Sequence, residues 1–194
     1  MSLRLTTGFC HGLTLQSPSM ATRPTAGRVR AAVWNSLHEI LEGARVLDVF
    51  AGSGAVGIEA LSRGARSATF VEQDRDALKS LKINLEAVAA RARKQEITIQ
   101  TMVLARSAEQ ALKTCPDASF DILWLDPPYA LVLSLVPSLA PELLRLAAPG
   151  GRLIIESAAA DLQALESLGS GWELSRQKVY GKIGVSFYQR RSVE

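Results

Sequence analysis

The tetrapeptide Asp126-Pro127-Pro128-Tyr129 directly follows the apolar run 122–125 and combines residue types that could activate an amine. An exocyclic amine on a nucleobase is a poor nucleophile, because its lone pair is delocalised into the ring. The Asp126 side chain and the Pro127 carbonyl could each accept one N–H hydrogen, which would localise that lone pair. The prolines fix φ and bring no N–H donors, and Tyr129 offers a face on which a base could stack. These residues predict a catalytic loop for methyl transfer to an amine. The alternative is a loop that only ends a strand.

A second group of residues has the spacing of a nucleotide-binding turn. Gly52, Gly54 and Gly57 lie between a predicted strand and a predicted helix, and they allow a tight turn with close approach of a ligand to the backbone. Asp48 ends that strand and could bind the ammonium of a methionine moiety. Glu72 ends the next strand and could accept hydrogen bonds from ribose hydroxyls. This arrangement fits S-adenosylmethionine better than NAD, because a sulfonium donor would lie beside the amine site. The alternative is that both acids only cap neighbouring helices.

Short β-rich runs alternate with helix-period segments from Arg45 onward, which is typical of a parallel sheet covered on both faces. We predict strands over 45–49, 67–72, 96–103, 120–125 and 150–156, and helices over 54–63, 76–91, 108–113, 133–146 and 161–168. Runs 172–179 and 183–189 predict an antiparallel hairpin around Gly181-Lys182. The expected fold is α/β: a Rossmann-like class I S-adenosylmethionine-dependent methyltransferase, with a seven-stranded, mostly parallel sheet that ends in this hairpin.

The N-terminal portion differs in composition from the rest. Runs 3–7 and 13–16 predict a small hairpin across Gly8–Gly12, and Thr25 is expected to cap a helix from about Gly27 to Leu41. We therefore expect an N-terminal hairpin and extension over residues 1–24 and a methyltransferase domain over residues 25–194.

Three acids end predicted strands: Asp48 the first, Glu72 the second and Asp126 the fourth. In an open α/β sheet, ligands bind beyond the carboxyl ends of the strands, near the point where strand order reverses. If the first and fourth strands are neighbours, we expect the three acids to meet in one crevice.

Composition limits the remaining function classes. At 194 residues and 47% hydrophobic content, the chain suits one sizeable core. Its longest apolar runs fall short of the ~20 residues that span a bilayer, and no secretion signal is evident, so we expect a cytoplasmic protein and no membrane partner. Cys10 and Cys115 have neither metal nor disulfide spacing, and no metal is expected. Nothing in the sequence calls for a dimer, and we expect a monomer.

The net charge of +3 resides in the first 45 residues, where five arginines face two glutamates. The rest of the chain is neutral, with 17 basic and 17 acidic residues. A cationic N-terminal quarter suggests docking of an anionic partner such as a phosphate backbone. Ordinary scatter of charge over a solvated face is the alternative.

Over nearly its whole length the sequence resembles the RsmD-type 16S ribosomal RNA guanine-N2 methyltransferases. The motifs that carry the resemblance are 22–25 with 28–30 and 34–37, 47–54 with 57–64, 71–74, 126–129 and 178–181. The resemblance implies transfer of a methyl group from S-adenosylmethionine to the exocyclic N2 amine of a guanine in 16S rRNA, with S-adenosyl-L-homocysteine as product. The partner would be 16S rRNA or the assembled small ribosomal subunit.

Together with the residue patterns, the resemblance implies a role for each site residue. The catalytic residues would be Asp126, Pro127, Pro128 and Tyr129. The cofactor-binding residues would be Arg23, Pro24, Thr25, Asp48, Phe50, Ala51, Gly52, Ser53, Gly54, Glu72, Gln73, Ser107, Ala108 and Asp126. The RNA-binding residues would be Arg23, Arg28 and Arg30.

The sequence departs from the family at two places. The family's N-terminal hairpin usually carries a glycine-rich, basic stretch, whereas Gly8–Gly12 has no permanent cation. Ser107 stands where the family tends to have Asp or Asn, so backbone groups could recognise the donor's adenine instead.

Two other classes of function remain open. The acceptor could be adenine N6 in DNA or a protein glutamine amide, although the chain has no room for a sequence-reading domain and a glutamine acceptor would favour Asn at position 126. The chain could also be a non-catalytic RNA-binding module on the same fold. The presence of Asp48, Glu72 and Asp126 argues against that module.

Overall fold

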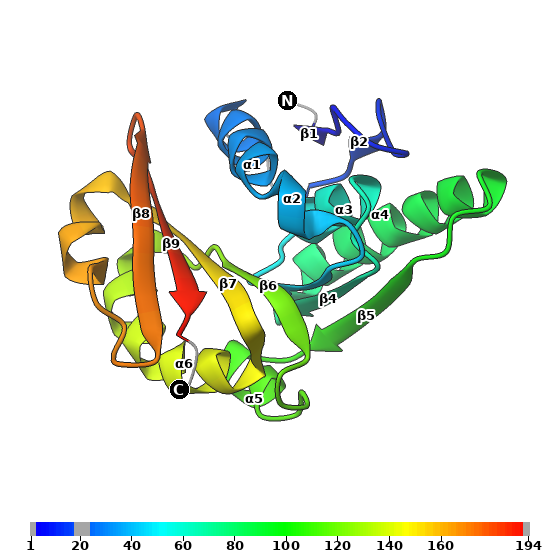
Figure 1. Cartoon of the computed structure of the whole chain (residues 1–194). Coiled ribbons are helices and arrows are strands. Elements are labelled where there is room, and N and C mark those ends of the chain that lie inside the picture. The colour runs from blue at the N-terminus through cyan, green and yellow to red at the C-terminus, as the bar shows by residue number, and fades with distance from the viewer. Residues whose placement is uncertain (1–2, 18–23, 192–194) are drawn as a thin grey trace. The chain divides into compact units, whose positions relative to one another are not determined.

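A seven-stranded sheet in the order β5-β4-β3-β6-β7-β9-β8 forms the centre of the fold. The structure is a computed structural model that describes residues 3–17 and 24–191 (Figure 1). It contains two compact units, Met1–Arg106 and Ser107–Glu194. The predicted fold class, a mostly parallel sheet that ends in an antiparallel hairpin, is confirmed.

The first unit holds a parallel three-stranded part of the sheet and a separate small hairpin. Its elements are β1 (Leu3–Arg4), β2 (Thr14–Leu15), α1 (Pro24–Ser36), α2 (His38–Leu41), β3 (Arg45–Val49), α3 (Ala55–Ser62), β4 (Ser67–Glu72), α4 (Arg75–Lys94) and β5 (Gln100–Ala105). Strand β3 pairs in parallel with β4, from Arg45 opposite Ser67 to Val49 opposite Val71. The β3 residues after Arg45 are buried, as expected for a strand covered on both faces.

Several predicted elements of this unit have different bounds in the structure, and the physical reason is clear for the first helix and for β5. The predicted helix 27–41 starts at Pro24, which suits a first helical position because its missing N–H would have no partner there. Thr25 therefore lies inside α1 and is not its N-cap. At Leu37 the backbone leaves helical geometry (φ −114°, ψ 11°), which separates α1 from α2. Strand β5 starts four residues late, because Glu96 has φ 57° and the Ile97 N–H still bonds to the Ala92 carbonyl at the end of α4.

The second unit joins a parallel strand pair to the C-terminal hairpin. Its elements are α5 (Ala108–Leu112), β6 (Phe120–Leu125), η1 (Tyr129–Leu131), α6 (Val132–Leu146), β7 (Ala147–Ala158), η2 (Ala159–Asp161), η3 (Gln163–Leu165), β8 (Trp172–Tyr180) and β9 (Ile183–Arg190). Strands β6 and β7 are parallel, β7 and β9 are antiparallel, and β8 pairs with β9 as the predicted hairpin.

The predicted helix 161–168 is wrong. Two short 3₁₀ turns, η2 and η3, stand in its place. Carbonyls of this segment accept hydrogen bonds from side chains of the hairpin: Gln177 Nε2 donates to the carbonyl of Leu162, between the two turns, at 2.7 Å, and the Tyr188 hydroxyl donates to the carbonyl of Leu165 in η3. These tertiary bonds take the place of a helical ladder.

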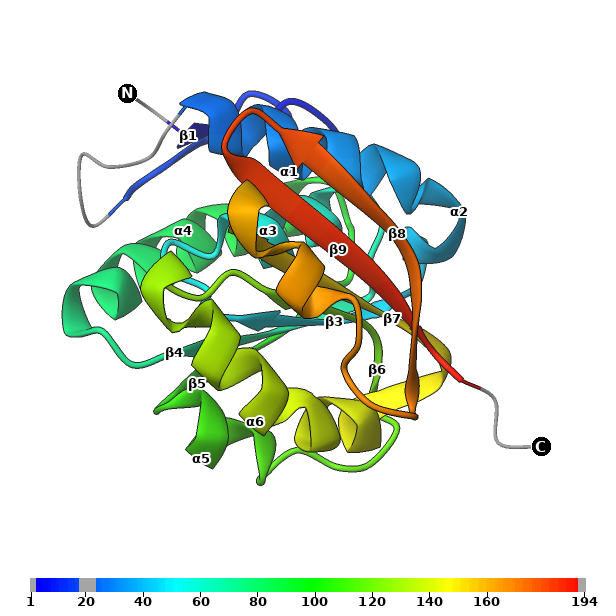
Figure 2. The same ribbon diagram turned by 90° about the vertical axis from the view of Figure 1, so that its left-hand side faces the viewer.

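Helix α6 lies beside α5 and β7 (Figure 2). It buries one side, at Val132, Val136, Leu139, Leu143 and Leu146. By length and composition alone, Tyr129–Leu146 is the one stretch within the described ranges that could cross a membrane, and a core helix can pass the same test.

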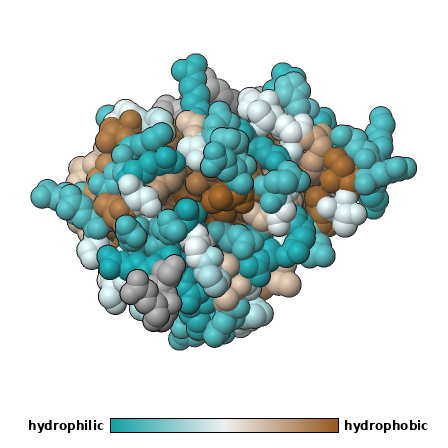
Figure 3. Space-filling model, viewed as in Figure 1, coloured by the Kyte–Doolittle hydropathy of each residue, from teal (hydrophilic) through white to brown (hydrophobic). Residues whose placement is uncertain are grey.

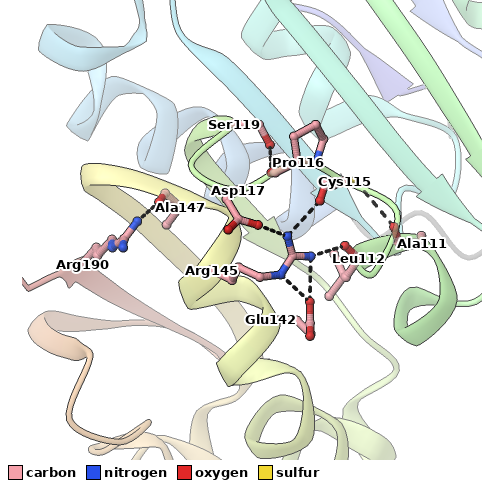
Figure 4. Close-up of polar contacts among 10 residues, drawn as sticks. All are labelled: Ala111, Leu112, Cys115, Pro116, Asp117, Ser119, Glu142, Arg145, Ala147 and Arg190. Atoms are coloured by element: carbon pink, nitrogen blue, oxygen red, sulfur yellow. Dashed lines mark hydrogen bonds and ion pairs between the residues drawn. The ribbon is translucent and has the colours of Figure 1, made fainter.

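Arg145 fastens the end of α6 to the loop that precedes β6 (Figure 4). Its guanidinium donates to the carbonyls of Leu112 and Cys115, each at 2.9 Å, and pairs with Asp117 and Glu142. This cluster is structural and lies at the end of α6 far from its first residue, Val132.

The surface on one side of the molecule is mainly hydrophilic, with interrupted apolar patches (Figure 3). Among the large apolar side chains that are exposed, Met102 lies on β5, the strand at one edge of the sheet. Isolated exposed apolar residues of this kind are ordinary in folded proteins.

Candidate active site

The turn between β3 and α3 has the geometry of a ligand cradle. Phe50, Gly52 and Gly54 all adopt positive φ, at 65°, 56° and 79°. A Cβ on Gly52 would meet nothing within 4 Å, so the turn faces open space at this point. A Cβ on Gly57 would lie 2.5 Å from the Phe70 ring, so this glycine allows α3 to pack closely on β4.

The two acids predicted to bind the donor both lie against this turn. Asp48 Oδ2 accepts the Gly57 N–H at 2.9 Å, and Glu72 Oε2 accepts the Gly52 N–H at 2.7 Å. Gly57 is in the first turn of α3, so Asp48 accepts an N–H at the start of this helix, in partial agreement with the alternative that the two acids only cap helices. Glu72 does not cap α4, because the N-cap of that helix is Asp74. Both carboxylates are therefore held at the glycine turn.

Asp48 is buried, with 1% of its surface exposed. This burial raises the pKa of Asp48 to about 7, and the negative charge of Glu72 acts in the same direction. The Gly57 N–H and the positive charge of Arg30 oppose the rise. Asp48 therefore titrates near neutral pH, where the approach of a cationic ligand would favour its ionised form.

Arg30 has a different environment from the one predicted. It is buried, and its Nε lies 2.6 Å from Glu59 Oε2 in an ion pair between α1 and α3. Arg63 Nη2 lies 2.6 Å from the other Glu59 oxygen, and Arg63 Nη1 donates to Asn35 Oδ1 at 2.7 Å. Arg30 thus holds α1 against α3 and presents little surface to an RNA phosphate.

The other residues predicted near the start of α1 are described only in part. Arg23 lies outside the described residues. Pro24 and Thr25 open α1, but their side chains also lie outside the description. Arg28 is exposed on α1, as a contact with RNA requires.

Asn84 of α4 is a residue that the sequence did not single out. Its amide nitrogen donates to the carbonyls of Ser53 and Gln16, each at 2.9 Å, and its Oδ1 accepts the Gln16 N–H at 2.8 Å. It therefore joins the glycine turn to the segment that follows the N-terminal hairpin. Nothing in the local sequence signals this role, because Gln16 is 68 residues away.

The N-terminal hairpin is held by α3 and α4 (Figure 1). The Phe9 N–H bonds to the Ser62 carbonyl at 2.9 Å. Arg91 Nη1 donates to the His11 carbonyl at 2.8 Å, and Gln95 Nε2 donates to the Phe9 carbonyl at 3.0 Å. Arg91 therefore brings a cation to a hairpin tip that has no permanent cation of its own.

In the second unit, the predicted catalytic loop follows β6. Asp126 is exposed, Pro127 is buried and Tyr129 begins η1. The Tyr129 hydroxyl donates to Glu156 Oε1 at 3.1 Å. Glu156, which the sequence did not single out, is a buried residue near the carboxyl end of β7.

The remaining predicted cofactor residues have structural roles as well. Gln73 is exposed, and its N–H bonds to Glu72 Oε1 at 2.8 Å. Ser107 is the N-cap of α5, where its Oγ accepts the Gln110 N–H at 3.3 Å, and Ala108 is buried. Within residues 3–17 and 24–191, no group of three or more His, Cys, Asp and Glu side chains could hold a metal ion.

The structure thus brings candidate site residues together within each unit. Unit 1 gathers Asp48 and Glu72 at the turn Gly52–Gly57. Unit 2 gathers Tyr129 of the predicted catalytic loop and Glu156. The meeting of Asp48, Glu72 and Asp126 in one crevice stays a prediction.

This glycine turn, on a mostly parallel sheet that ends in an antiparallel hairpin, defines a Rossmann-like fold of the class I methyltransferase type. A family model described as "Conserved hypothetical protein 95" matches residues 3–189. The chain belongs to this family, the RsmD-type methyltransferases, which confirms the resemblance seen in the sequence.

Named relatives and solved structures agree with this assignment. "Ribosomal RNA small subunit methyltransferase D" of Escherichia coli K12 is 33% identical over 196 residues, covering 98% of this chain and 91% of the relative. The protein of the same name from Buchnera aphidicola subsp. Baizongia pistaciae is 32% identical, covering 86% of this chain and 80% of the relative. The structure "Putative methyltransferase yhhF from Escherichia coli" has a TM-score of 0.82 at 29% identity, with both chains covered completely. SMU.776, crystallised with SAH, has a TM-score of 0.65 at 16% identity, covering 93% of this chain and 52% of that one, and shows the fold alone.

Proposed function

We propose that the protein transfers a methyl group from S-adenosylmethionine to the N2 amine of a guanine in 16S ribosomal RNA. The proposal depends on one combination: an Asp-Pro-Pro-Tyr loop and a glycine turn bracketed by two carboxylates, in a family whose E. coli member is a small-subunit rRNA methyltransferase by name. The partner is 16S rRNA or the assembled small subunit, and the enzyme acts as a cytoplasmic monomer.

The residues of the glycine turn fit the donor. The turn is open at Gly52, where the backbone can approach a ligand. Glu72 accepts three backbone N–H groups, from Gly52 at Oε2 and from Gln73 and Asp74 at Oε1, and a carboxylate has about four acceptor positions in all, which leaves capacity for one ribose hydroxyl. Asp48 favours a positive charge nearby, as on the methionine ammonium. When bound, S-adenosylmethionine supplies the methyl group as a sulfonium electrophile.

The loop after β6 fits the activation of the acceptor. Asp126 is exposed and is an acceptor when ionised, and the Pro127 carbonyl is a second acceptor. Each takes one N2 hydrogen, and the nitrogen lone pair is directed at the methyl carbon. Transfer would exchange the S–CH3 bond for an N2–CH3 bond with S-adenosyl-L-homocysteine as the leaving group, and Asp126 or water would take the extra amine proton.

For the RNA, Arg28 is the exposed cation of α1 that we assign to phosphate contact. Arg23 keeps its predicted role in RNA and donor binding. Arg30 has no direct RNA role in this proposal, because its guanidinium is buried against Glu59.

The substitution Asp126→Ala tests the assignment of the catalytic acid. We expect methyl transfer to be lost, with a decrease of about 100-fold or more, because removal of a preorganised charge-stabilising group costs this much in other enzymes. Donor binding measured by calorimetry should persist. The matched control is Glu166→Ala, an exposed acid of the same unit, which should leave transfer unchanged. Normal turnover of Asp126→Ala would exclude the role given to this residue.

A further inference from the structure

Glu156 is a buried acid that the proposed reaction does not yet use. Only 6% of the residue is exposed, although it lies in β7 close to the predicted catalytic loop. Its Oε1 accepts the hydroxyl of Tyr129, the last residue of that loop, at 3.1 Å. Burial of a carboxylate is costly unless it is bonded, so an acid in this place calls for a reason.

The strand register places Glu156 beside Asp126. Strands β6 and β7 run in parallel, and Leu125 lies opposite Ile155. Asp126 and Glu156 are the next residues on the two chains. Because neighbouring strands are separated by about 4.8 Å, the two acids lie side by side near the carboxyl ends of these strands, Asp126 directly after β6 and Glu156 two residues before the end of β7.

The Watson–Crick edge of guanine carries two adjacent kinds of donor, the N1–H and the N2 amine. Adenine has an acceptor at N1, which an ionised carboxylate repels. A pair of neighbouring carboxylates therefore matches guanine and opposes adenine. Tyr129 connects the stacking of the base with the position of Glu156, because the Watson–Crick edge of a base stacked on the Tyr129 ring would lie near the hydroxyl that bonds to Glu156.

We propose that Glu156 is a specificity-determining residue that accepts the N1–H of the target guanine, while Asp126 and the Pro127 carbonyl accept the N2 hydrogens. This inference rests on the proposed function and extends it to base selection. The Tyr129 hydroxyl orients the carboxylate through Oε1, and a carboxylate has further acceptor positions for the base.

A base analogue that lacks the N1–H tests the contact. The target guanine, once mapped, is replaced by 2-aminopurine in an RNA assembled into small subunits. This base keeps the N2 amine and lacks the N1–H and the O6 of guanine, and the Glu156 variants below separate the loss of the N1–H from the loss of O6. We expect the wild-type enzyme to prefer guanine in kcat/KM by about tenfold to a hundredfold, as for loss of a hydrogen bond to a charged group.

The substitution Glu156→Gln should reduce that preference to within a few fold, because a rotated amide can donate to the N1 acceptor of 2-aminopurine. Glu156→Asp keeps the carboxylate and should keep the preference for guanine at a lower rate. Tyr129→Phe keeps the ring and removes the hydroxyl, so it should weaken the preference in part. The matched control Glu166→Gln should leave the preference unchanged.

A purely structural role for Glu156 would slow both substrates equally and leave the preference intact. Equal kcat/KM for the two bases in the wild type, or the same preference in wild type and Glu156→Gln, overturns the inference. If the wild type transfers no methyl to guanine N2 at all, it is the proposed function that fails, and the two failures are therefore distinguishable.

Discussion

Donor affinity should weaken about tenfold between pH 8 and pH 6, because of the titration of Asp48. Its pKa is raised by burial to about 7, with Glu72 acting in the same direction and the Gly57 N–H and Arg30 opposing. Asp48 is therefore about 90% ionised at pH 8 and about 10% ionised at pH 6. In the limit where the cationic donor binds only the ionised form, apparent affinity is proportional to the ionised fraction, so the binding free energy changes by about 1.4 kcal/mol.

Isothermal titration calorimetry with S-adenosyl-L-homocysteine measures this effect directly, since the product keeps the ammonium. Titrations at pH 6, 7 and 8 give the affinity, and two buffers of different ionisation enthalpy give the protons released. We expect release of about half a proton per ligand at pH 7. Asp48→Asn removes the titrating group and should flatten the pH dependence. A wild-type affinity that is constant over this range, or a slope that persists in Asp48→Asn, would refute the reasoning.

The same pKa has a consequence for the free protein. A folded pKa above the ordinary value of 3.8 means that the folded state holds the proton more tightly than the unfolded state. The stability contributed by Asp48 is therefore present below about pH 4 and decreases as pH rises through the window up to about pH 7. Above that window it is constant. In chemical denaturation, the free energy of unfolding of the wild type should therefore fall relative to that of Asp48→Asn as pH rises across this window.

Two further predictions concern packing near the site. Glu59→Gln should lower the free energy of unfolding by about 3–5 kcal/mol in chemical denaturation, because Arg30 would be left as a buried charge without its carboxylate. A variant with Arg30→Met and Glu59→Leu together should be less destabilised than Glu59→Gln. A double variant that is more destabilised than Glu59→Gln would contradict the account of a buried ion pair. Gly57→Ala should cost about 1–3 kcal/mol in thermal or chemical unfolding, because its Cβ would overlap the Phe70 ring. The control Gly27→Ala in α1, where a Cβ meets nothing within 4 Å, should stabilise by roughly 0.5–1 kcal/mol, and equal effects of the two would refute the packing argument.

Three strands of the parallel part of the sheet could be predicted from the sequence residue for residue. Strands β3, β4 and β6 have the predicted bounds, because each is a short apolar run between turn residues. The helix expected over 161–168 failed because its carbonyls are bonded by Gln177 and Tyr188, which come later in the chain. Such tertiary bonds leave no trace in local periodicity.

In the candidate site, too, residues marked by local sequence could be predicted and residues that depend on distant partners could not. Asp48 and Glu72 could be predicted because strand ends and glycine spacing mark them in the sequence. Glu59 and Glu156 could not, since their partners Arg30 and Tyr129 are 29 and 27 residues away. The burial of Arg30 was missed for the same reason, because the sequence around an arginine in a helix does not show that a carboxylate on another helix will pair with it.

The most direct test of the central claim is transfer of a labelled methyl group from S-adenosylmethionine to small ribosomal subunits that lack the modification, compared with free 16S rRNA. The labelled nucleoside is then identified by mass spectrometry. The account predicts N2-methylguanosine at one position in 16S rRNA. Label in N6-methyladenosine or in protein, or no transfer to either RNA substrate, would contradict it.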